Sequence, residues 1–359
     1  MRKYVPRFAG VSLLIFALSL IVYAVCINCS VCADFVNSTI SHGIRYLLAL
    51  ATEKLPFSLF ELLIILAPVL LVFIIVSAVK RRGVVKKFRF LLAIVGVVSL
   101  IFTSYIYTLG IGYRTSSLAA KTGIEARSEL SAEELVHTVN IVQRELNAIA
   151  ENLLVTDGET HMPYTVNELS EKIVRAYDVM LAEYPILTNY NSRVKQVYFS
   201  TVMSDLRITG IYSFFTGEAN VNVEYPDYCL VYTTAHEMAH QRGISRENEA
   251  NFVAFLVAIS SDDEYIRYSG YLNLYEYLAS AIYSLDPELY YTVSAQLHQT
   301  ARADILAASR VYNEHKDSVL GRINEKLNDA YLKANGTEGI VTYNYVVRLA
   351  VGYYEKVEN

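Results

Sequence analysis

Three long apolar runs in the first third of the chain constrain its fold more than any other feature. They cover residues 8–27, 57–79 and 90–112, and none contains Lys, Arg or Asp. Each has roughly the 20 residues that an α-helix needs to cross a bilayer. The sequence therefore predicts a membrane domain, residues 1–113, with three transmembrane helices. The basic start, Arg2, Lys3 and Arg7, also fits a signal peptide, which stays as the alternative. The first run exceeds an ordinary signal-peptide core and lacks a clear A-x-A cleavage site, so we prefer a retained anchor.

Basic residues between the runs predict the orientation. The seven N-terminal residues hold three Lys or Arg and segment 80–89 holds six, whereas the long loop between the first two runs holds only Arg45 and Lys54. Positively charged segments stay on the cytoplasmic side. We therefore expect a multi-pass protein of the cytoplasmic membrane with a cytoplasmic N-terminus. Everything after about residue 113 is expected to be extracytoplasmic.

Two further features lie near the outer end of the first run. Residues 40–55 have the apolar spacing of a short amphipathic helix, which we expect on the outer membrane surface. Cys26, Cys29 and Cys32 form a C-x2-C-x2-C cluster. Metal binding, lipidation, a local disulfide and simple burial of small residues all remain open for it.

Charge separates the chain into two parts. Residues 1–113 hold eleven Lys or Arg and three Asp or Glu, so this part is basic. Residues 114–359 hold twenty Lys or Arg and thirty-three Asp or Glu, so this part is acidic. The overall net charge of −5 argues against a nucleic-acid-binding protein. Residues 114–359 suffice for one domain with a substantial core. Periodicity predicts helices at residues 131–154, 166–184, 287–314, 317–334 and 343–357, and strands at 207–215 and 218–224.

The strongest chemical signal is an H-E-x-x-H motif formed by His236, Glu237 and His240. On a helix, residues i and i+4 lie on the same face, so both imidazoles can bind one Zn²⁺. The glutamate beside the first histidine can then act on a zinc-bound water. Gly243 predicts the end of this helix. The motif thus predicts a zinc site with Glu237 as its catalytic base.

Catalytic zinc takes three protein ligands, and two glutamates of the following helix compete for the third position. Glu247 shares one helical face with Asn251 and small residues, whereas Glu249 lies beside Phe252. We prefer Glu247 as the ligand, and Glu249 stays open. Asn251 is expected to orient a ligand histidine through a hydrogen bond to the ring nitrogen that does not bind the metal.

The motif HEMAH at residues 236–240, followed closely by ENEAN at residues 247–251, resembles the gluzincin zinc peptidases, especially membrane-bound ones. In that group E-x-x-A-D follows on the next helix and its first glutamate, here matched by Glu247, is the third ligand. Asn251 stands where the family has aspartate. The gap between the two motifs is also shorter than in the family, which keeps Glu249 in consideration.

The resemblance also implies where a substrate binds. In gluzincin-like folds an edge strand next to the zinc helix binds an extended peptide by β-augmentation. Segment 218–224 takes that place here, so Asn220 and Asn222 are expected to contact the substrate backbone. An oxyanion-stabilising residue is also required, for which Tyr268 and Tyr271 are candidates.

A wider resemblance covers nearly the whole chain. The three spans, LPFSL at residues 55–59, FTGEAN at 215–220 and HEMAHQRGISRENEANF at 236–252 together are similar to a bacterial membrane family, domain of unknown function 3810. The two resemblances imply a mainly α protein. Its three N-terminal transmembrane helices would be followed by a largely helical, gluzincin-type zincin-like domain, with a short β-hairpin or small sheet before the zinc helix.

These features together predict a membrane-anchored zinc metallopeptidase, a hydrolase that cleaves peptide bonds on the outer side of the cytoplasmic membrane. Its partners would be a peptide or protein substrate and the lipid bilayer, with no nucleic acid. Three alternatives stay open: a zincin-like sensor or transducer, a zinc amidase acting on a non-protein envelope substrate, and a scaffold with a degenerate site.

Overall fold

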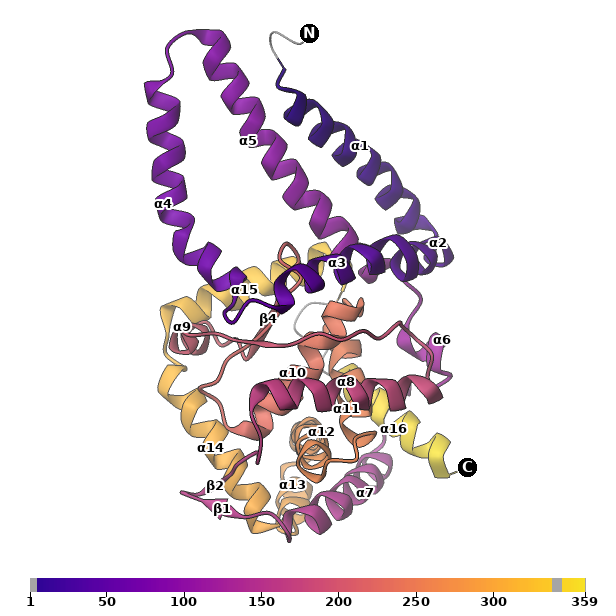
Figure 1. Cartoon of the computed structure of the whole chain (residues 1–359). Coiled ribbons are helices and arrows are strands. Elements are labelled where there is room, and N and C mark those ends of the chain that lie inside the picture. The colour runs from indigo at the N-terminus through magenta and orange to yellow at the C-terminus, as the bar shows by residue number, and fades with distance from the viewer. Residues whose placement is uncertain (1–4, 338–343, 359) are drawn as a thin grey trace. The chain divides into compact units, whose positions relative to one another are not determined.

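The computed structural model describes residues 5–337 and 344–358, which fall into two compact units (Figure 1). The first unit holds residues 1–116 together with residues 213–218, and the second holds residues 117–212 and 219–359. The first division lies close to the predicted boundary after residue 113. Residues 213–218 were not expected to leave the domain that surrounds them in sequence.

The first unit is helical throughout its regular elements. It contains α1 (Arg7–Asn28), α2 (Ser30–Val36), a π-helical turn (Asn37–Ser41), α3 (His42–Glu53), α4 (Leu59–Lys80), α5 (Val84–Tyr105), a second π-helical turn (Ile106–Gly110) and a 3₁₀ turn (Gly112–Arg114).

All three predicted spans are helices, and within the described residues three helices are long and apolar enough to cross a membrane. Helix α1 packs along α5, where a Cβ on Gly96 would come within 3.1 Å of the Ala9 Cα. Such small residues let two helices approach closely in a bilayer. Helix α4 buries none of its side chains, and its apolar surface is the kind that lipid would cover.

The third span starts earlier than predicted. Helix α5 begins at Val84, so most of the basic segment expected as a loop is helical, and only residues 81–83 separate α4 from α5. Gly83 makes this short turn with a φ of +90°, a conformation that glycine adopts readily. The two most N-terminal basic residues, Arg2 and Lys3, lie outside the described residues.

The segment before α4 confirms the predicted amphipathic helix as α3 and adds α2 before it. Of the alternatives for the cysteine cluster, the structure contains a disulfide between Cys29 and Cys32. Cys26 is a buried free thiol. Two of the three cysteines are therefore held in a local covalent bond rather than offered as thiolates.

Residues 213–218 are bound within the first unit by several hydrogen bonds. The Glu218 carboxylate accepts from the backbone N–H groups of Leu59 and Phe60, at 3.0 and 2.8 Å. It thereby satisfies two of the unpaired donors at the start of α4. The hydroxyls of Ser104 and Thr108 donate to the carbonyl of Phe214. This loop therefore caps one candidate span and is bound by another.

The second unit is also mainly helical. Its helices are α6 (Leu118–Thr122), α7 (Ala132–Ala150), α8 (Val166–Glu183), α9 (Ser200–Asp205), α10 (Asp227–Arg242), α11 (Glu247–Ile259), α12 (Glu264–Leu285), α13 (Pro287–Ser294), α14 (Gln299–His315), α15 (Val319–Ala334) and α16 (Asn344–Glu358). Its strands are β1 (Val155–Thr156), β2 (Glu159–Thr160), β3 (Lys195–Gln196), β4 (Gly210–Tyr212) and β5 (Ala219–Val221).

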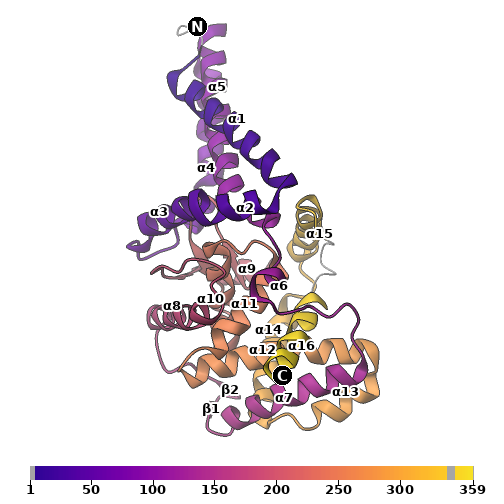
Figure 2. The ribbon, with the colours of Figure 1, turned by 90° about the vertical axis from the view of Figure 1, so that its right-hand side faces the viewer.

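Helices α10 and α11 form the centre of the second unit, and α8, α12 and α16 pack around them (Figure 2). Both central helices are buried on nearly all sides, as their apolar and small residues require. Helix α7 begins with the predicted capping box, in which Ser131 and Glu134 exchange hydrogen bonds. Its apolar stripe packs mainly on α12.

The predicted hairpin before α10 is part of a three-stranded sheet. The strand order is β3-β5-β4, with β5 parallel to β3 and antiparallel to β4. Strand β5 is therefore central, and the prediction of an edge strand at residues 218–224 is wrong. The edge strand next to α10 is β4.

One predicted helix is broken in two. Residues 287–314 form α13 and α14, separated at residues 295–298. The side chain of Asn147, on α7, donates to the Gln296 carbonyl and accepts from the His298 N–H. This distant amide replaces the hydrogen bonds that a continuous helix would have made there. The last predicted helix is α16, and its expected first residue, Tyr343, lies outside the described residues.

Candidate metal centre

The H-E-x-x-H motif lies on the last two turns of α10. The helix follows Pro226, and the carboxylate of Asp227 in its first turn accepts a hydrogen bond from the Met162 N–H. It ends at Gly243, whose φ of +109° is left-handed, as the sequence predicted. The turn after Gly243 reverses the chain, so that α11 begins close to the motif.

This turn brings Glu247, the first residue of α11, to the two histidines. Its Oε2 lies 3.3 Å from Nε2 of His236 and 3.4 Å from Nε2 of His240. One ligand-type atom from each of the three residues lies within 4.8 Å of the others. The two imidazole rings are almost perpendicular, at 89°, with centroids 4.6 Å apart. Three donors from two helices therefore converge on one point.

The spacing of these donors suits a zinc ion. Zinc bonds of about 2.0–2.2 Å at tetrahedral angles place neighbouring ligand atoms about 3.3–3.5 Å apart. The two nitrogen–oxygen distances, 3.3 and 3.4 Å, have this length. They are longer than the roughly 2.7–2.9 Å of a charge-assisted hydrogen bond. Two imidazoles and a carboxylate also form a donor set found at catalytic zinc.

Hydrogen bonding orients His240, and charge couples it to Glu247. Nδ1 of His240 lies 2.7 Å from the Ile244 carbonyl, which leaves Nε2 for the shared point. Burial acts to lower the pKa of His240, yet the neighbouring Glu247 carboxylate raises it to about 9. Burial acts to raise the pKa of Glu247, but the two histidines hold it well below its usual range. The carboxylate and the two imidazoles are thus electrostatically coupled in a buried position.

Glu237 is buried beside this cluster and points toward the sheet. Burial raises the pKa of its carboxyl above the ordinary value, although both histidines and a hydrogen bond from the Tyr212 backbone favour its charged form. In the described part of the chain, its Oε2 has no hydrogen-bond partner. A buried carboxyl with one oxygen unengaged can accept and release a proton.

Sequence reasoning missed Gly210, the first residue of β4. A Cβ at this position would lie 2.6 Å from Oε1 of Glu237 and 2.5 Å from Cγ2 of Thr233. Only glycine leaves room for Glu237 under the strand. Glycine inside a strand pattern often marks such a close approach, and this signal was present in the sequence.

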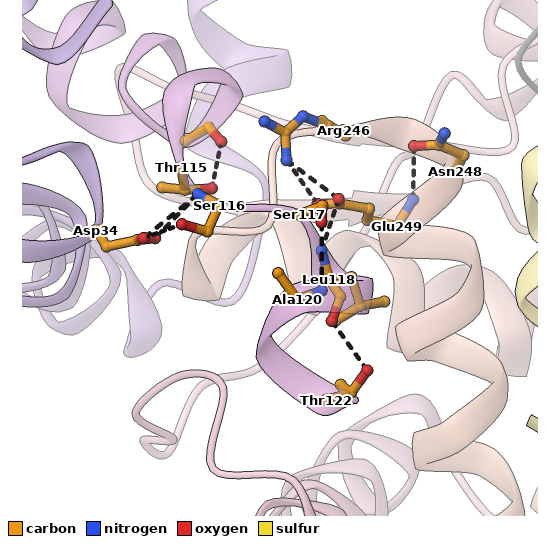
Figure 3. Close-up of polar contacts among 11 residues, drawn as sticks. Asp34, Thr115, Ser116, Ser117, Leu118, Ala120, Thr122, Arg246, Asn248 and Glu249 are labelled. Atoms are coloured by element: carbon orange, nitrogen blue, oxygen red, sulfur yellow. Dashed lines mark hydrogen bonds and ion pairs between the residues drawn. The ribbon is translucent and has the colours of Figure 1, made fainter. Parts of the chain in front are cut away.

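The runner-up ligand, Glu249, is engaged elsewhere. Its carboxylate accepts a hydrogen bond from the Leu118 N–H at 2.9 Å and pairs with Arg246 at 3.1 Å (Figure 3). The side chain is almost completely buried in these contacts. Of the two glutamates that the sequence left open, Glu247 is the one that faces the histidines.

Asn251 does not have the expected role. Its backbone carbonyl accepts a hydrogen bond from the Tyr232 hydroxyl. Among the described residues its side chain makes no hydrogen bond to either imidazole, and the Ile244 carbonyl orients His240 instead. The Ile244 carbonyl belongs to the turn after Gly243, in which the Ile244 N–H donates to the Ala239 carbonyl.

The substrate-contact prediction for Asn220 and Asn222 also needs correction. Both side chains are completely buried. The Asn220 amide donates to the Ile211 carbonyl, and the Asn222 amide donates to Ser204 Oγ and to the Ile208 carbonyl. The Asn220 amide therefore bonds across the sheet, whereas the Asn222 amide bonds the end of β5 to α9 and to the segment before β4. Neither side chain presents surface to a ligand.

Of the two tyrosines proposed for oxyanion stabilisation, Tyr268 is buried in the core of the second unit and Tyr271 is partly buried against that core. The Tyr268 hydroxyl donates to the buried Asp304 carboxylate, which also accepts from Thr160. Tyr271 packs edge-on against Phe255. Neither contact involves the histidine cluster, and both are those of core aromatic residues.

Comparison with known proteins identifies a family. No curated protein and no solved structure shows significant similarity to the chain. One family model, described as a protein of unknown function, matches residues 36–351. This match extends from α2 to α16 and includes the histidine cluster. The chain therefore belongs to the DUF3810 family.

Proposed function

We propose that this protein is a membrane-anchored zinc metallopeptidase with a gluzincin-type site. The observation that carries the proposal is the convergence of His236, His240 and Glu247 next to the buried, partly unengaged carboxyl of Glu237. Both Nε2 atoms lie at zinc-ligand spacing from one carboxylate oxygen, 3.3 and 3.4 Å. A bound zinc ion would supply an activated water and polarise the carbonyl of the scissile bond.

The chain's own residues would perform the remaining steps. Glu237 would accept the proton released by the attacking water and pass it to the leaving amine. Gly210 leaves space for that carboxyl, and the Tyr212 backbone orients it. Strand β4, at the edge of the sheet beside α10, offers an edge on which an extended peptide could pair.

The proposed location is the outer side of the cytoplasmic membrane. It is supported by three helices able to span a membrane and by the basic residues clustered between α4 and the first turns of α5. Positively charged segments of this kind remain cytoplasmic. After three spans, the second unit would be extracytoplasmic.

The test uses the full-length protein in detergent or nanodiscs. We expect one zinc per chain and cleavage of an unfolded protein substrate that chelation abolishes. Glu237→Gln should retain zinc and lose turnover by about 100-fold or more, the scale of general acid–base catalysis. Glu171→Gln, a change at an exposed glutamate of α8, is the matched control and should leave both unchanged.

Three outcomes would separate this proposal from its alternatives. Absence of stoichiometric zinc would contradict it. Cleavage of amide-linked cell-wall fragments but not of unfolded proteins would indicate a zinc amidase instead. Retention of zinc with no hydrolysis of either substrate would leave a scaffold or a sensor.

The sensor alternative has one observation in its favour. The loop of residues 213–218 caps α4 through Glu218, and the strands that enter and leave this loop, β4 and β5, pack on α10. A change in α4 could thus be transmitted along the hairpin. If Glu218→Gln alters signalling by a partner protein while Glu237→Gln does not, the transducer function would be preferred.

A further inference from the structure

Helix α15 exposes an apolar face that the second unit does not cover. Val319, Leu320, Ile323 and Leu327 are 60%, 46%, 51% and 65% exposed. At 3.6 residues per turn, these four side chains share one sector of about 100–120°. Ala330 and Ala334 fall in the same sector. Isolated exposed apolar residues are ordinary, but a continuous stripe of this kind indicates a binding surface.

The opposite face of α15 already has its protein contacts. Gly321 and Leu332 are buried, and a Cβ on Gly321 would lie within 3.0 Å of the Asp205 carbonyl at the end of α9. The Asn324 amide donates to the Leu206 carbonyl, and Glu325 pairs with Arg207. Since this face holds the helix in place, the apolar sector is not needed for folding.

Positive charge borders the apolar sector on one side. On the helical projection, Arg322, Lys326 and Lys333 form a single row beside Val319 and Ile323. All three side chains are exposed. The two acidic residues of the helix, Glu325 and Asp329, lie on the far side of this row from the apolar sector, and Asp329 pairs with Lys333 at 2.7 Å. A row of basic residues is notable in residues 114–359, where Asp and Glu outnumber Lys and Arg by thirty-three to twenty.

We propose that α15 is an interfacial helix that docks on a surface of anionic phospholipid. An apolar sector with a basic border is the pattern of helices that lie in the membrane plane. The apolar residues would enter the acyl boundary while the long basic side chains extend to the phosphates. The same chain supplies the membrane context, since it has three helices apolar enough to span a bilayer.

A second copy of this chain is a less suitable occupant. Antiparallel pairing of two α15 helices through the apolar sector would place their basic rows side by side, and like charges so juxtaposed oppose association. Anionic lipid satisfies both the apolar sector and the basic row. This proposal does not depend on the metal site, so its failure would leave the peptidase proposal untouched.

The experiment places a fluorophore on α15 of the full-length protein in nanodiscs. Leu327→Cys probes the apolar sector, and Asn328→Cys, the next residue, probes the polar side as the matched control. The wild-type protein measures background labelling of Cys26 and Cys229. The discs contain phosphatidylcholine with or without phosphatidylglycerol, plus a lipid carrying a quencher below the headgroup. Far-UV circular dichroism confirms that each variant is folded.

We expect strong quenching at position 327, little at position 328, and a requirement for phosphatidylglycerol. Each basic residue near an anionic surface should change the ratio of docked to undocked helix about fivefold. Charge reversal by Lys326→Glu, Arg322→Glu and Lys333→Glu should therefore abolish quenching at position 327. Equal quenching at both positions, or none at either, would overturn the proposal. Intermolecular cross-linking through position 327, without quenching, would show that a second copy covers the helix.

Discussion

The second unit contains two histidine–carboxylate clusters with the same kinds of residues and different geometry. In the first, His236 and His240 both direct Nε2 toward a single oxygen of Glu247. In the second, one histidine lies between two carboxylates. His315 contacts Asp205 through Nδ1, at 2.8 Å, and Glu224 through Nε2, at 3.6 Å.

Under the proposed function, donor geometry rather than composition makes the first cluster a metal site and the second an ion pair. A metal needs lone pairs that converge on one point, which two imidazoles on one helix face provide. A single imidazole has nitrogens on opposite sides of its ring, so two carboxylates bound to both nitrogens cannot share an ion with it. We therefore expect zinc to bind only at the first cluster, where it replaces the proton that Glu247 favours on His240.

The largest effect is expected from a substitution that removes one histidine of the first cluster. His236→Ala should lower zinc affinity by more than about 100-fold, because loss of an outer-shell partner alone costs about 10–100-fold. His315→Ala is the matched control from the second cluster and should leave zinc stoichiometry unchanged. Competition with a zinc chelator on the full-length protein measures both. If His236→Ala and His315→Ala lose zinc equally, the first cluster is not the specific zinc site.

The next largest effect tests which of the two glutamates, Glu247 or Glu249, is the third zinc ligand. Glu247→Gln should weaken zinc binding strongly and change stability little. Glu249→Gln should retain zinc but destabilise the fold by about 1–3 kcal/mol, since it disrupts buried hydrogen bonds and an ion pair with Arg246. Chelator competition and denaturant unfolding provide the two readouts. Zinc loss in Glu249→Gln with zinc retained in Glu247→Gln would reverse the assignment.

A smaller effect on zinc affinity is expected from the turn at Gly243, which brings Glu247 to the two histidines. Gly243→Ala places a Cβ on a residue with a φ of +109° and should cost about 1–2 kcal/mol of stability. It should also weaken zinc binding, because the turn carries the Ile244 carbonyl that holds His240. Gly158→Ala, with a φ of +87° and open space around it, is the control. Gly158→Ala should lose stability but keep its zinc affinity. If both variants lose zinc affinity equally, the turn at Gly243 has no specific role in zinc binding.

The smallest effect is the pH dependence of the second cluster. Hydrogen bonding to Asp205, with the charge of Glu224, raises the pKa of His315 above its usual value. The stabilisation should be fully present below the unfolded pKa of about 6.5 and lost as pH rises through the folded-state pKa. His315→Asn should therefore destabilise the protein by about 0.5–1 kcal/mol at acidic pH and by less at alkaline pH. Denaturant unfolding at several pH values measures this, and a pH-independent difference would exclude the ion pair.

Much of the fold followed from local patterns. The hydropathy of the three spans and the Ser131 capping box both predicted elements that the structure contains. Where the predictions were wrong, a distant group intervened. The expected helix at residues 287–314 is broken by the Asn147 amide from α7, and the predicted edge strand is central because β3 pairs with it.

The sequence by itself determined that three helices are apolar enough to cross a membrane and that His236, Glu237 and His240 share the end of one helix. Hydropathy and i, i+4 spacing act within a few turns, so neighbouring residues suffice for both. Only the tertiary structure decided that Glu247 faces the histidines, that Leu118 engages Glu249, and that Gly210 leaves room for Glu237. Those outcomes depend on where a turn and a strand place atoms from separate elements, which no local pattern specifies.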